Sequence, residues 1–380
     1  MKLLFYRYGS ICEPDIIAGF QELGHTIIEM TEEVSNKSLL PSECVQFITK
    51  QLFDEPVDFV FSINFFPYLS DVCQIFKLPY LCWSVDSPVM ELFSASIEHP
   101  CNRIFLFDRA QYNEILPLNP DHVFHLPLAV NIASKQQVIQ SASTELHNHF
   151  SSDISFVGSL YTEKCPYDKL TDAPAYLSGY LDGLIESQIL IYGGFLIEDL
   201  LTDDIIDQFK QHLPGFYYPP YDSHLTDRKI VAQLYISSKI SAVERVRTME
   251  YLSKKYAVDL YTASDTSALT HIHNRGLAKT MEEMPLIFHN SCINLNITSK
   301  GIRSGIPLRV FDILSCGGFL LTNYQTELAE LFVPGEDLIV YDSIEDLSEK
   351  CSYYLSHESE RKEIAHNGFE KAVSQHTYQI

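Results

Sequence analysis

The hydrophobic positions of the first 150 residues form short runs separated by amphipathic and polar segments. The runs that predict β-strands are Lys2–Tyr8, His25–Met30, Val57–Ile63, Tyr80–Trp83, Arg103–Phe107 and His122–Leu126. The run Val57–Ile63 is largely apolar, as expected of a strand that is buried on both faces of a parallel sheet. Because helical segments such as Pro14–Leu23 alternate with these runs, the pattern predicts a parallel, doubly wound sheet.

The second half repeats this kind of pattern. Residues 131–150 are polar and weakly patterned, which favours a linker, and Asp153–Gly158 then predicts a fresh strand. The later segments predict two long helical regions and four more strands, namely 175–213 and 228–256, then Ala257–Thr262, Ile293–Ile297, Phe319–Thr322 and Leu338–Tyr341. Ser343 and Asp346 have the spacing of a helix N-cap. We therefore predict an α/β fold of two Rossmann-like domains, residues 1–150 and 151–380.

The stretch from Ile293 to Thr322 predicts a strand, a loop with glycine and arginine, a helix, and a second strand. Pro307 predicts that the helix begins at residue 306 or 307, because proline is favoured at the first helical position. Arg309 and Asp312 are three residues apart and share a helical face, and Arg303 precedes them in the loop. Together with free N–H groups at the helix start, they could bind a diphosphate and a ribose. The alternative, which spacing alone slightly favours, is an ordinary Arg–Asp pair on a capped surface helix.

Three other residues are weaker candidates for a site. Gly158 and Ser159 follow a predicted strand, where glycine lets the backbone approach a phosphate but can equally serve turn geometry. Asp86 follows the strand that ends at Trp83, where it would face a cleft between the two domains. An Asp before Ser-Pro is more often a turn or cap residue, so the functional interpretation of Asp86 rests on position only.

Composition narrows the classes of function. The formal net charge is −23, from 27 Lys and Arg against 50 Asp and Glu, so general binding to nucleic acid or anionic lipid is disfavoured. A few local arginines can still hold a small anion, because the distant negative charge is screened over about 8–10 Å. No run of about 20 apolar residues is present, so we expect no stable membrane insertion. The start of the chain lacks the apolar core of a signal peptide, and we expect a cytoplasmic protein.

No recognised metal-binding or nucleophile motif is present. The nine cysteines are scattered without a C-x-x-C pair, which suits reduced, mostly buried thiols better than disulfides or zinc. The chain contains no D-x-D, Walker A or G-x-S-x-G sequence. We therefore expect no metal site, and no cofactor other than a substrate.

A resemblance to a known family adds to this interpretation. It is carried by LYISSKISAVERV, MPLIFHNSCINLNIT, IRSGIPLRVFDILSCGGFLLTN and LFVPGEDLIVYDS, from about residue 233 onward, and by SVDSP, HPCNRIFLFDR and HLPLAV in the first half. The second half resembles the CgeB-type (spore-maturation) glycosyltransferases, and the first half is similar to the uncharacterised domain that often precedes them. The resemblance implies the GT-B architecture, in which two Rossmann-like domains face each other across a cleft. It also implies a nucleotide-sugar donor on the C-terminal domain and a last helix that packs back on the N-terminal one.

The resemblance also implies roles for individual residues. Asp312 stands where related transferases have a glutamate that holds the nucleotide ribose, and Gly158 and Ser159 match the loop near the phosphates. A second motif glutamate, near the donor sugar, is replaced here by Ser304. That departure puts in doubt both the usual contact with the donor sugar and retention of the stereochemistry at its anomeric carbon. If the reaction inverts, Asp86 is the candidate for the base.

The function implied is transfer of a sugar from a UDP- or GDP-linked donor to a peptide, protein or glycan, without a metal ion. Arginines and helix N-termini would neutralise the leaving diphosphate in place of a metal. The replacement of the motif glutamate by Ser304 favours one alternative, a non-catalytic nucleotide-sugar-binding or partner protein of a glycan modification system. A second alternative is an epimerase with the GT-B fold.

Overall fold

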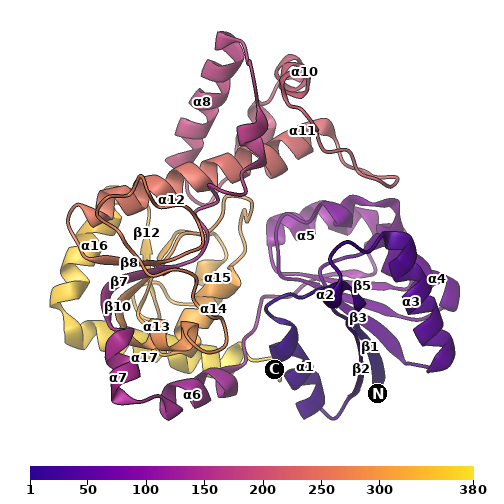
Figure 1. The fold of residues 1–380 in the computed structure, drawn as a ribbon, viewed down its shortest axis with the longest axis horizontal. Helices are drawn as coiled ribbons and strands as arrows, with labels where there is room; N and C mark the ends of the chain where they lie inside the picture. Colours follow the sequence, from indigo (N-terminus) through magenta and orange to yellow (C-terminus); the bar gives the residue numbers. More distant parts are fainter. The chain divides into compact units, whose positions relative to one another are not determined.

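The computed structural model describes residues 1–380, and the chain divides into two compact units (Figure 1). The first unit contains Met1–Asn131 together with two short later segments, Pro219–Leu225 and Tyr378–Ile380. The second unit contains Ile132–Tyr218 and Thr226–Thr377. Each unit is built around its own six-stranded parallel sheet, so the prediction of two Rossmann-like sheets is confirmed.

The first sheet has the strand order β2-β1-β3-β4-β5-β6, with every neighbouring pair parallel. Its strands are β1 (Lys2–Tyr6), β2 (Thr26–Met30), β3 (Phe59–Ile63), β4 (Tyr80–Ser84), β5 (Asn102–Leu106) and β6 (Val123–His125). All five residues of β3 are buried, because this strand lies inside the sheet and is covered on both faces. The order reverses between β1 and β3, which makes their carboxyl ends the switch point of this sheet.

Helices and short helical turns connect these strands. They are α1 (Glu13–Glu22), α2 (Glu32–Ser35), α3 (Pro41–Asp54), α4 (Pro67–Phe76), α5 (Arg109–Ile115), η1 (Met90–Phe93), η2 (Ala95–Glu98) and η3 (Leu116–Leu118). The later segment Pro219–Leu225 is held to this unit by backbone pairing. The Ala95 amide donates to the Asp222 carbonyl at 2.8 Å, and the His224 amide donates to the Phe93 carbonyl at 2.7 Å.

The second sheet has the order β12-β11-β10-β7-β8-β9, again entirely parallel. Its strands are β7 (Ser152–Val157), β8 (Val258–Tyr261), β9 (His273–Asn274), β10 (Ser291–Asn296), β11 (Leu320–Asn323) and β12 (Ile339–Tyr341). The order reverses between β7 and β10, so the carboxyl ends of these two strands form the switch point of the second unit.

The helices of the second unit cover this sheet and extend beyond it. They are α6 (Ile132–Ser141), α7 (Thr144–His149), η4 (Pro166–Lys169), α8 (Ala175–Ile189), α9 (Ile197–Leu200), α10 (Asp203–His212), α11 (Asp227–Ile230), the π-helical segment η5 (Val231–Ile236), α12 (Ser237–Ser253), α13 (Met284–Asn290), α14 (Leu308–Ser315), α15 (Leu328–Leu331), α16 (Ile344–Ser356) and α17 (Glu358–Gln375). The helices α8, α10 and α11 stand together on one side of this unit, beyond α12 (Figure 1).

Three features differ from the sequence-based expectations. Residues 132–149, expected to be a linker inside the first domain, form α6 and α7 and belong to the second unit. The two-residue strand β9 was not expected, because neither His273 nor Asn274 is apolar. The helix α14 begins one residue later than predicted, with Pro307 as its N-cap in an extended conformation. The last helix, α17, belongs to the second unit and Tyr378–Ile380 belong to the first, and the packing of this helix on the first domain stays a prediction.

Several side-chain expectations can be compared directly. Ser343 caps α16, because its side chain accepts a hydrogen bond from the Asp346 amide at 3.1 Å, as predicted. All nine cysteines are thiols, and seven of them are buried. None of the helices is both long and apolar enough to cross a lipid bilayer.

The Gly317–Gly318 pair between α14 and β11 suggests a test of packing. Gly317 has φ +69°, and a Cβ on Gly318 would lie 2.5 Å from the Phe288 carbonyl oxygen. We expect Gly318→Ala to lower the free energy of unfolding by about 1–3 kcal/mol through overpacking. The control is Gly179→Ala on the exposed face of α8, where nothing lies within 4 Å and stability should rise by about 0.5–1 kcal/mol. Urea denaturation measures both, and a stable Gly318→Ala variant would contradict the packing described.

Candidate functional site at the switch point of the second sheet

Four of the residues predicted from sequence lie in the loops that leave the carboxyl ends of β7 and β10. The loop after β7 carries Gly158 and Ser159, and the loop after β10 carries Arg303 and Ser304 before α14 begins. Ligands of open parallel sheets bind outside the carboxyl ends of the strands, at the point where the strand order reverses. This is therefore the place in the second unit where the topology favours a ligand.

Arg245, on α12, joins the two loops. Its Nη1 donates to the Ser159 carbonyl oxygen at 2.6 Å, and its Nη2 donates to the Ile297 carbonyl oxygen at 2.5 Å. The guanidinium also lies 4.7 Å from the ring centroid of Tyr161 and 5.4 Å from that of Phe156. The residue is 9 % exposed, and its bond to Ile297 is buried while its bond to Ser159 is partly buried. One buried cation thus sets the spacing of both loops.

A second contact from α12 holds the start of the loop after β10. The Lys300 ammonium lies 3.1 Å from a carboxylate oxygen of Glu244, and both side chains are buried. The Lys300 amide donates to the Ser241 hydroxyl at 2.9 Å. Burial raises the pKa of Glu244, and the neighbouring Lys300 ammonium opposes that rise. Residues 241, 244 and 245 therefore use one face of α12 to support the switch point.

Gly158 and Ser159 shape the turn after β7. The Ser159 hydroxyl accepts a hydrogen bond from the Tyr161 amide at 2.8 Å and donates to the Glu163 carboxylate at 2.9 Å. A Cβ at Gly158 would lie 3.3 Å from the Phe156 ring. Gly158 and Ser159 therefore serve the geometry of the turn, which was one of the two roles that the sequence allowed. Their other role, binding a phosphate, stays a prediction.

Arg309 and Asp312 lie together with a third residue, Lys135, that sequence reasoning missed. Arg309 Nη1 is 3.2 Å from one carboxylate oxygen of Asp312, and Lys135 Nζ is 3.3 Å from the other. Asp312 is 6 % exposed, and the Arg309 guanidinium lies 5.2 Å from the ring centroid of Phe288. Nothing in the local sequence indicates Lys135, because α6 meets α14 only in the folded unit. The helix face predicted for these residues carries a three-charge cluster.

Ser304 also has a partner that the sequence did not reveal. Its hydroxyl donates to the Glu327 carboxylate at 2.7 Å, and Glu327 is buried, with 3 % exposure. The neighbouring Gln325 donates from its side-chain amide to the carbonyls of Ile302 and Gly305 at 3.1 and 3.2 Å. The segment after β11 therefore braces the loop that carries Arg303, and it brings a carboxylate to the position where Ser304 replaces the motif glutamate.

The switch point of the first sheet is built differently. The amides of Tyr8, Gly9 and Ser10 all donate to one carboxylate oxygen of Glu13, at 2.9, 2.7 and 2.9 Å. The other oxygen pairs with Arg7 Nε at 2.9 Å, and Glu13 is fully buried. Successive amides of this kind form an anion-binding nest. Here the protein's own carboxylate fills the nest, so this loop offers no place for a phosphate.

Asp86 lies at the carboxyl end of β4 in the first unit and is exposed. The side-chain amide of Asn64 donates to the Asp86 carboxylate at 2.7 Å and to the Tyr8 hydroxyl at 2.9 Å. Asn64 adopts φ +58°, and its side-chain oxygen accepts from the Val85 amide at 3.0 Å. Burial raises the pKa of Tyr8, and the charge of Asp86 raises it further. Asp86 is thus oriented by an amide that the turns after β3 and β4 share.

Comparison with known proteins agrees with this fold. Residues 233–380 match the model of a family described as glycosyl transferase-like. A search of curated protein sequences finds no significant match. Among solved structures, Anabaena HepE in complex with UDP-glucose superimposes with a TM-score of 0.53 at 10% identity, covering 100% of this chain and 96% of that chain.

Two further solved structures give the same result. A glycosyltransferase from Rickettsia africae has a TM-score of 0.53 at 10% identity, covering 99% of this chain and 94% of its own. Sucrose-phosphate synthase from Thermosynechococcus elongatus has a TM-score of 0.52 at 9% identity, covering 100% and 96%. The fold is that of the GT-B glycosyltransferases.

The Arg245 contacts predict a large effect from one substitution. We expect Arg245→Ala to lower the free energy of unfolding by about 2–4 kcal/mol, because one buried and one partly buried carbonyl lose a charged donor. The control is Arg247→Ala on the same helix, whose exposed pair with Glu186 should contribute less than about 1 kcal/mol. Chemical denaturation gives both values, and hydrogen exchange should show faster exchange at residues 158–161 and 297–300 in Arg245→Ala only. Equal effects of the two substitutions would contradict the bridging role of Arg245.

Proposed function

We propose that this protein is a glycosyltransferase that takes a sugar from a nucleotide-diphosphate donor bound at the switch point of the second unit. The observation that carries the proposal is the match of residues 233–380 to a glycosyl transferase-like family, since this range contains the loop after β10 and α14. The GT-B fold of the whole chain supports it, and one structural neighbour is complexed with UDP-glucose. The donor is expected to be UDP- or GDP-linked.

The proposed donor contacts combine cations, backbone amides and one carboxylate. Arg303 and Arg309 would face the diphosphate, with Gly158 and Ser159 beside it, and Asp312 would hold the ribose hydroxyls. A guanidinium has five N–H donors, so pairing with Asp312 is compatible with a second, phosphate contact by Arg309. These charges would stabilise the leaving diphosphate without a metal ion.

The filled nest of the first unit supports this assignment of the donor to the second. A diphosphate at the β1 loop would have to displace the buried Glu13 carboxylate from three amides and Arg7. Removing one partner of such a network costs several kcal/mol, on the order of 3–5. The first unit is therefore proposed to bind the acceptor, a peptide, protein or glycan. The strongly negative net charge argues against nucleic acid as that acceptor.

Asp86 is proposed as the base that takes the proton of the acceptor hydroxyl if the reaction inverts. It is exposed, and the Asn64 amide fixes its carboxylate at 2.7 Å. A general base has to lie within hydrogen-bonding distance of the proton that it takes. An oriented carboxylate that faces solvent can be approached by an acceptor hydroxyl in this way. We further propose that the protein acts in the cytoplasm, where its nine thiols would stay reduced.

A second candidate function is nucleotide-sugar binding without transfer, as a partner in a glycan modification system. The replacement of the motif glutamate by Ser304 favours it. The Glu327 carboxylate, 2.7 Å from the Ser304 hydroxyl, weighs against it, because an acidic group is still present at that point of the loop. The two functions differ in one measurable product, the released nucleotide.

Nucleotide binding tests the proposed donor site. Isothermal titration with UDP and GDP should show weaker binding by Arg309→Ala and Asp312→Ala, by about ten- to a hundredfold, because each removes a charge-assisted contact. Lys254→Ala is the matched surface control, because this residue only forms an exposed pair with Glu250. Circular dichroism checks that the variants fold, which matters because Asp312 is buried. Unchanged affinity in both variants would remove the site assignment.

Turnover tests transfer itself. Incubating the protein with UDP-glucose or GDP-mannose and a panel of peptides and glycans should release nucleotide, with or without EDTA. Asp86→Asn should lower kcat by about 10²–10⁴ while leaving nucleotide affinity unchanged. Tight donor binding with no nucleotide released from any acceptor would favour the non-catalytic function. Isomerisation of the sugar without nucleotide release would identify an epimerase.

A further inference from the structure

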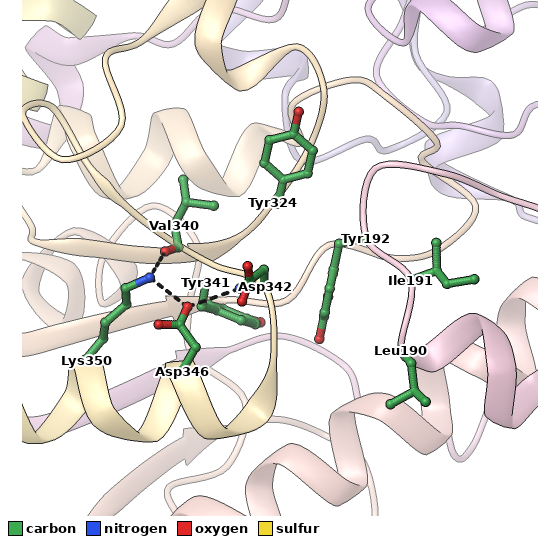
Figure 2. A pocket seen from close by; sticks show the side chains of 9 residues that line it. All are labelled: Leu190, Ile191, Tyr192, Tyr324, Val340, Tyr341, Asp342, Asp346 and Lys350. Atoms are coloured by element: carbon green, nitrogen blue, oxygen red, sulfur yellow. Dashed lines mark hydrogen bonds and ion pairs between the residues drawn. The ribbon is translucent and has the colours of Figure 1, made fainter.

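A pocket of about 560 Å³ lies in the second unit, beside β12 at the edge of its sheet. Leu190, Ile191 and Tyr192 form one wall, from the segment between α8 and α9. Its other lining residues come from the ends of β11 and β12 and from α16, namely Tyr324, Val340, Tyr341, Asp342, Asp346 and Lys350 (Figure 2). Its volume falls in the range of about 300–1,000 Å³ that is usual for small-molecule sites.

The pocket is distinct from the switch point. It opens at β12, the edge strand, which is separated from β10 by β11. Two strand spacings amount to about 10 Å. Tyr324 is the lining residue that comes nearest in sequence to the proposed donor site, because the next residue, Gln325, braces the loop after β10. Lys300, from the loop after β10, donates to the Ile191 carbonyl oxygen at 3.3 Å. The pocket is therefore a neighbour of the proposed donor site, although none of its lining residues belongs to that site.

The charges of the pocket exclude an anionic ligand. Asp342, Asp346 and Lys350 are the charged residues of the lining, and Figure 2 shows these three on one side with Leu190 and Ile191 opposite. The Lys350 ammonium is 2.6 Å from Asp346 and 2.7 Å from the Val340 carbonyl oxygen. Lys350 and Asp346 offset each other, so the lining keeps one net negative charge from the exposed Asp342. A phosphate would be repelled here.

The same charges argue against a simple cation. An ammonium ligand would lie near Lys350 and would find only one carboxylate without a cationic partner. A polyhydroxylated neutral molecule suits the lining better, because each hydroxyl both donates to a carboxylate and accepts from an ammonium. Ser343 and Asp346 have a structural role at the start of α16, where the Ser343 hydroxyl accepts from the Asp346 amide and the Asp346 carboxylate accepts from the Asp342 amide. The Asp342 side chain has no comparable structural role.

The aromatic walls supply the apolar contact that a sugar ring requires. One face of a pyranose consists of C–H groups, which pack on the flat face of an aromatic ring. Tyr192 is held in place, with its ring 6.0 Å from that of Tyr341 and the Lys300 ammonium 4.1 Å from its centroid. Tyr324 is 39 % exposed, so its ring has surface to offer.

The wall is closely fitted at Gly193. This residue has φ +71°, and a Cβ there would lie 2.6 Å from the Tyr324 ring. Only glycine lets the segment after Tyr192 approach Tyr324 this closely. The tyrosines therefore keep their positions before a ligand arrives, which reduces the ordering cost of binding.

We propose that this pocket binds an uncharged sugar residue of a glycan. The inference stands on the pocket alone and does not depend on the donor site. Tyr192 and Tyr324 would pack on the ring, Asp342 would accept its hydroxyls, and Lys350 would donate to one of them. A protein with such a pocket can hold a glycan chain at a point other than its reaction centre.

The test is saturation-transfer NMR and calorimetry with maltotriose, cellotriose and chitotriose as neutral probes and choline as the cationic probe. At least one oligosaccharide should bind, and Tyr324→Ala and Asp342→Asn should each weaken that binding about tenfold or more. The matched controls are Tyr353→Ala and Glu345→Gln, exposed residues of α16 outside the lining, which should bind as the wild type does.

The outcomes separate this inference from the proposed function. Loss of UDP binding in the Arg309 and Asp312 variants, with oligosaccharide binding intact, concerns the donor site only. The pocket proposal is overturned if none of the three oligosaccharides binds, if choline binds in their place, or if the Tyr324 and Asp342 substitutions leave oligosaccharide affinity unchanged. Gly193→Ala gives an independent check, since it should weaken oligosaccharide binding by pushing the wall against Tyr324.

Discussion

The second unit depends on the bridge that Arg245 makes between the carboxyl ends of β7 and β10. A parallel sheet fixes where its strands end, but it does not fix the loops that leave them at a switch point, because those loops diverge toward opposite faces. The guanidinium spans this divergence by donating to one carbonyl from each loop, at 2.6 and 2.5 Å. It can remain buried and charged because both carbonyls and two aromatic rings surround it. Any ligand at this edge would meet loops whose spacing α12 has set beforehand.

The two units share a sheet topology and use the switch point in opposite ways. In the first unit, the loop after β1 folds around Glu13, so its amides are consumed by an internal carboxylate. In the second unit, the corresponding loop closes on the Ser159 hydroxyl and the Arg245 guanidinium, and Arg309 lies in the first turn of α14, after the loop that leaves β10. An internal anion in one unit and cations in the other give the two sheets different preferences for a phosphate. This asymmetry follows from a few side chains, since the folds are alike.

The sequence predicted the elements that bury continuous apolar runs. It did not predict the elements and site residues whose positions depend on tertiary contacts. The strands β3, β7 and β10 were expected within one or two residues, because burial on both faces leaves a run that no other element resembles. The helix α6 was missed because only Ile139 among its residues is buried, which leaves almost no periodic signal. Of the site, Arg309 and Asp312 could be found from their spacing, since one helix turn brings them together. Lys135 and Glu327 could not, because each reaches the site from another element.

Glu327 also shows why a missing motif residue is weak evidence for a lost function. A motif describes side chains on one segment, whereas a site requires a group at a point in space. Ser304 lacks the carboxylate of the motif, yet its hydroxyl points at a buried carboxylate from the segment after β11. A carboxylate that is 3 % exposed would be costly to bury without such donors, so the contact with Ser304 helps to hold it there. The absence of a carboxylate from one segment therefore does not by itself exclude an acidic group at the same point of the folded loop.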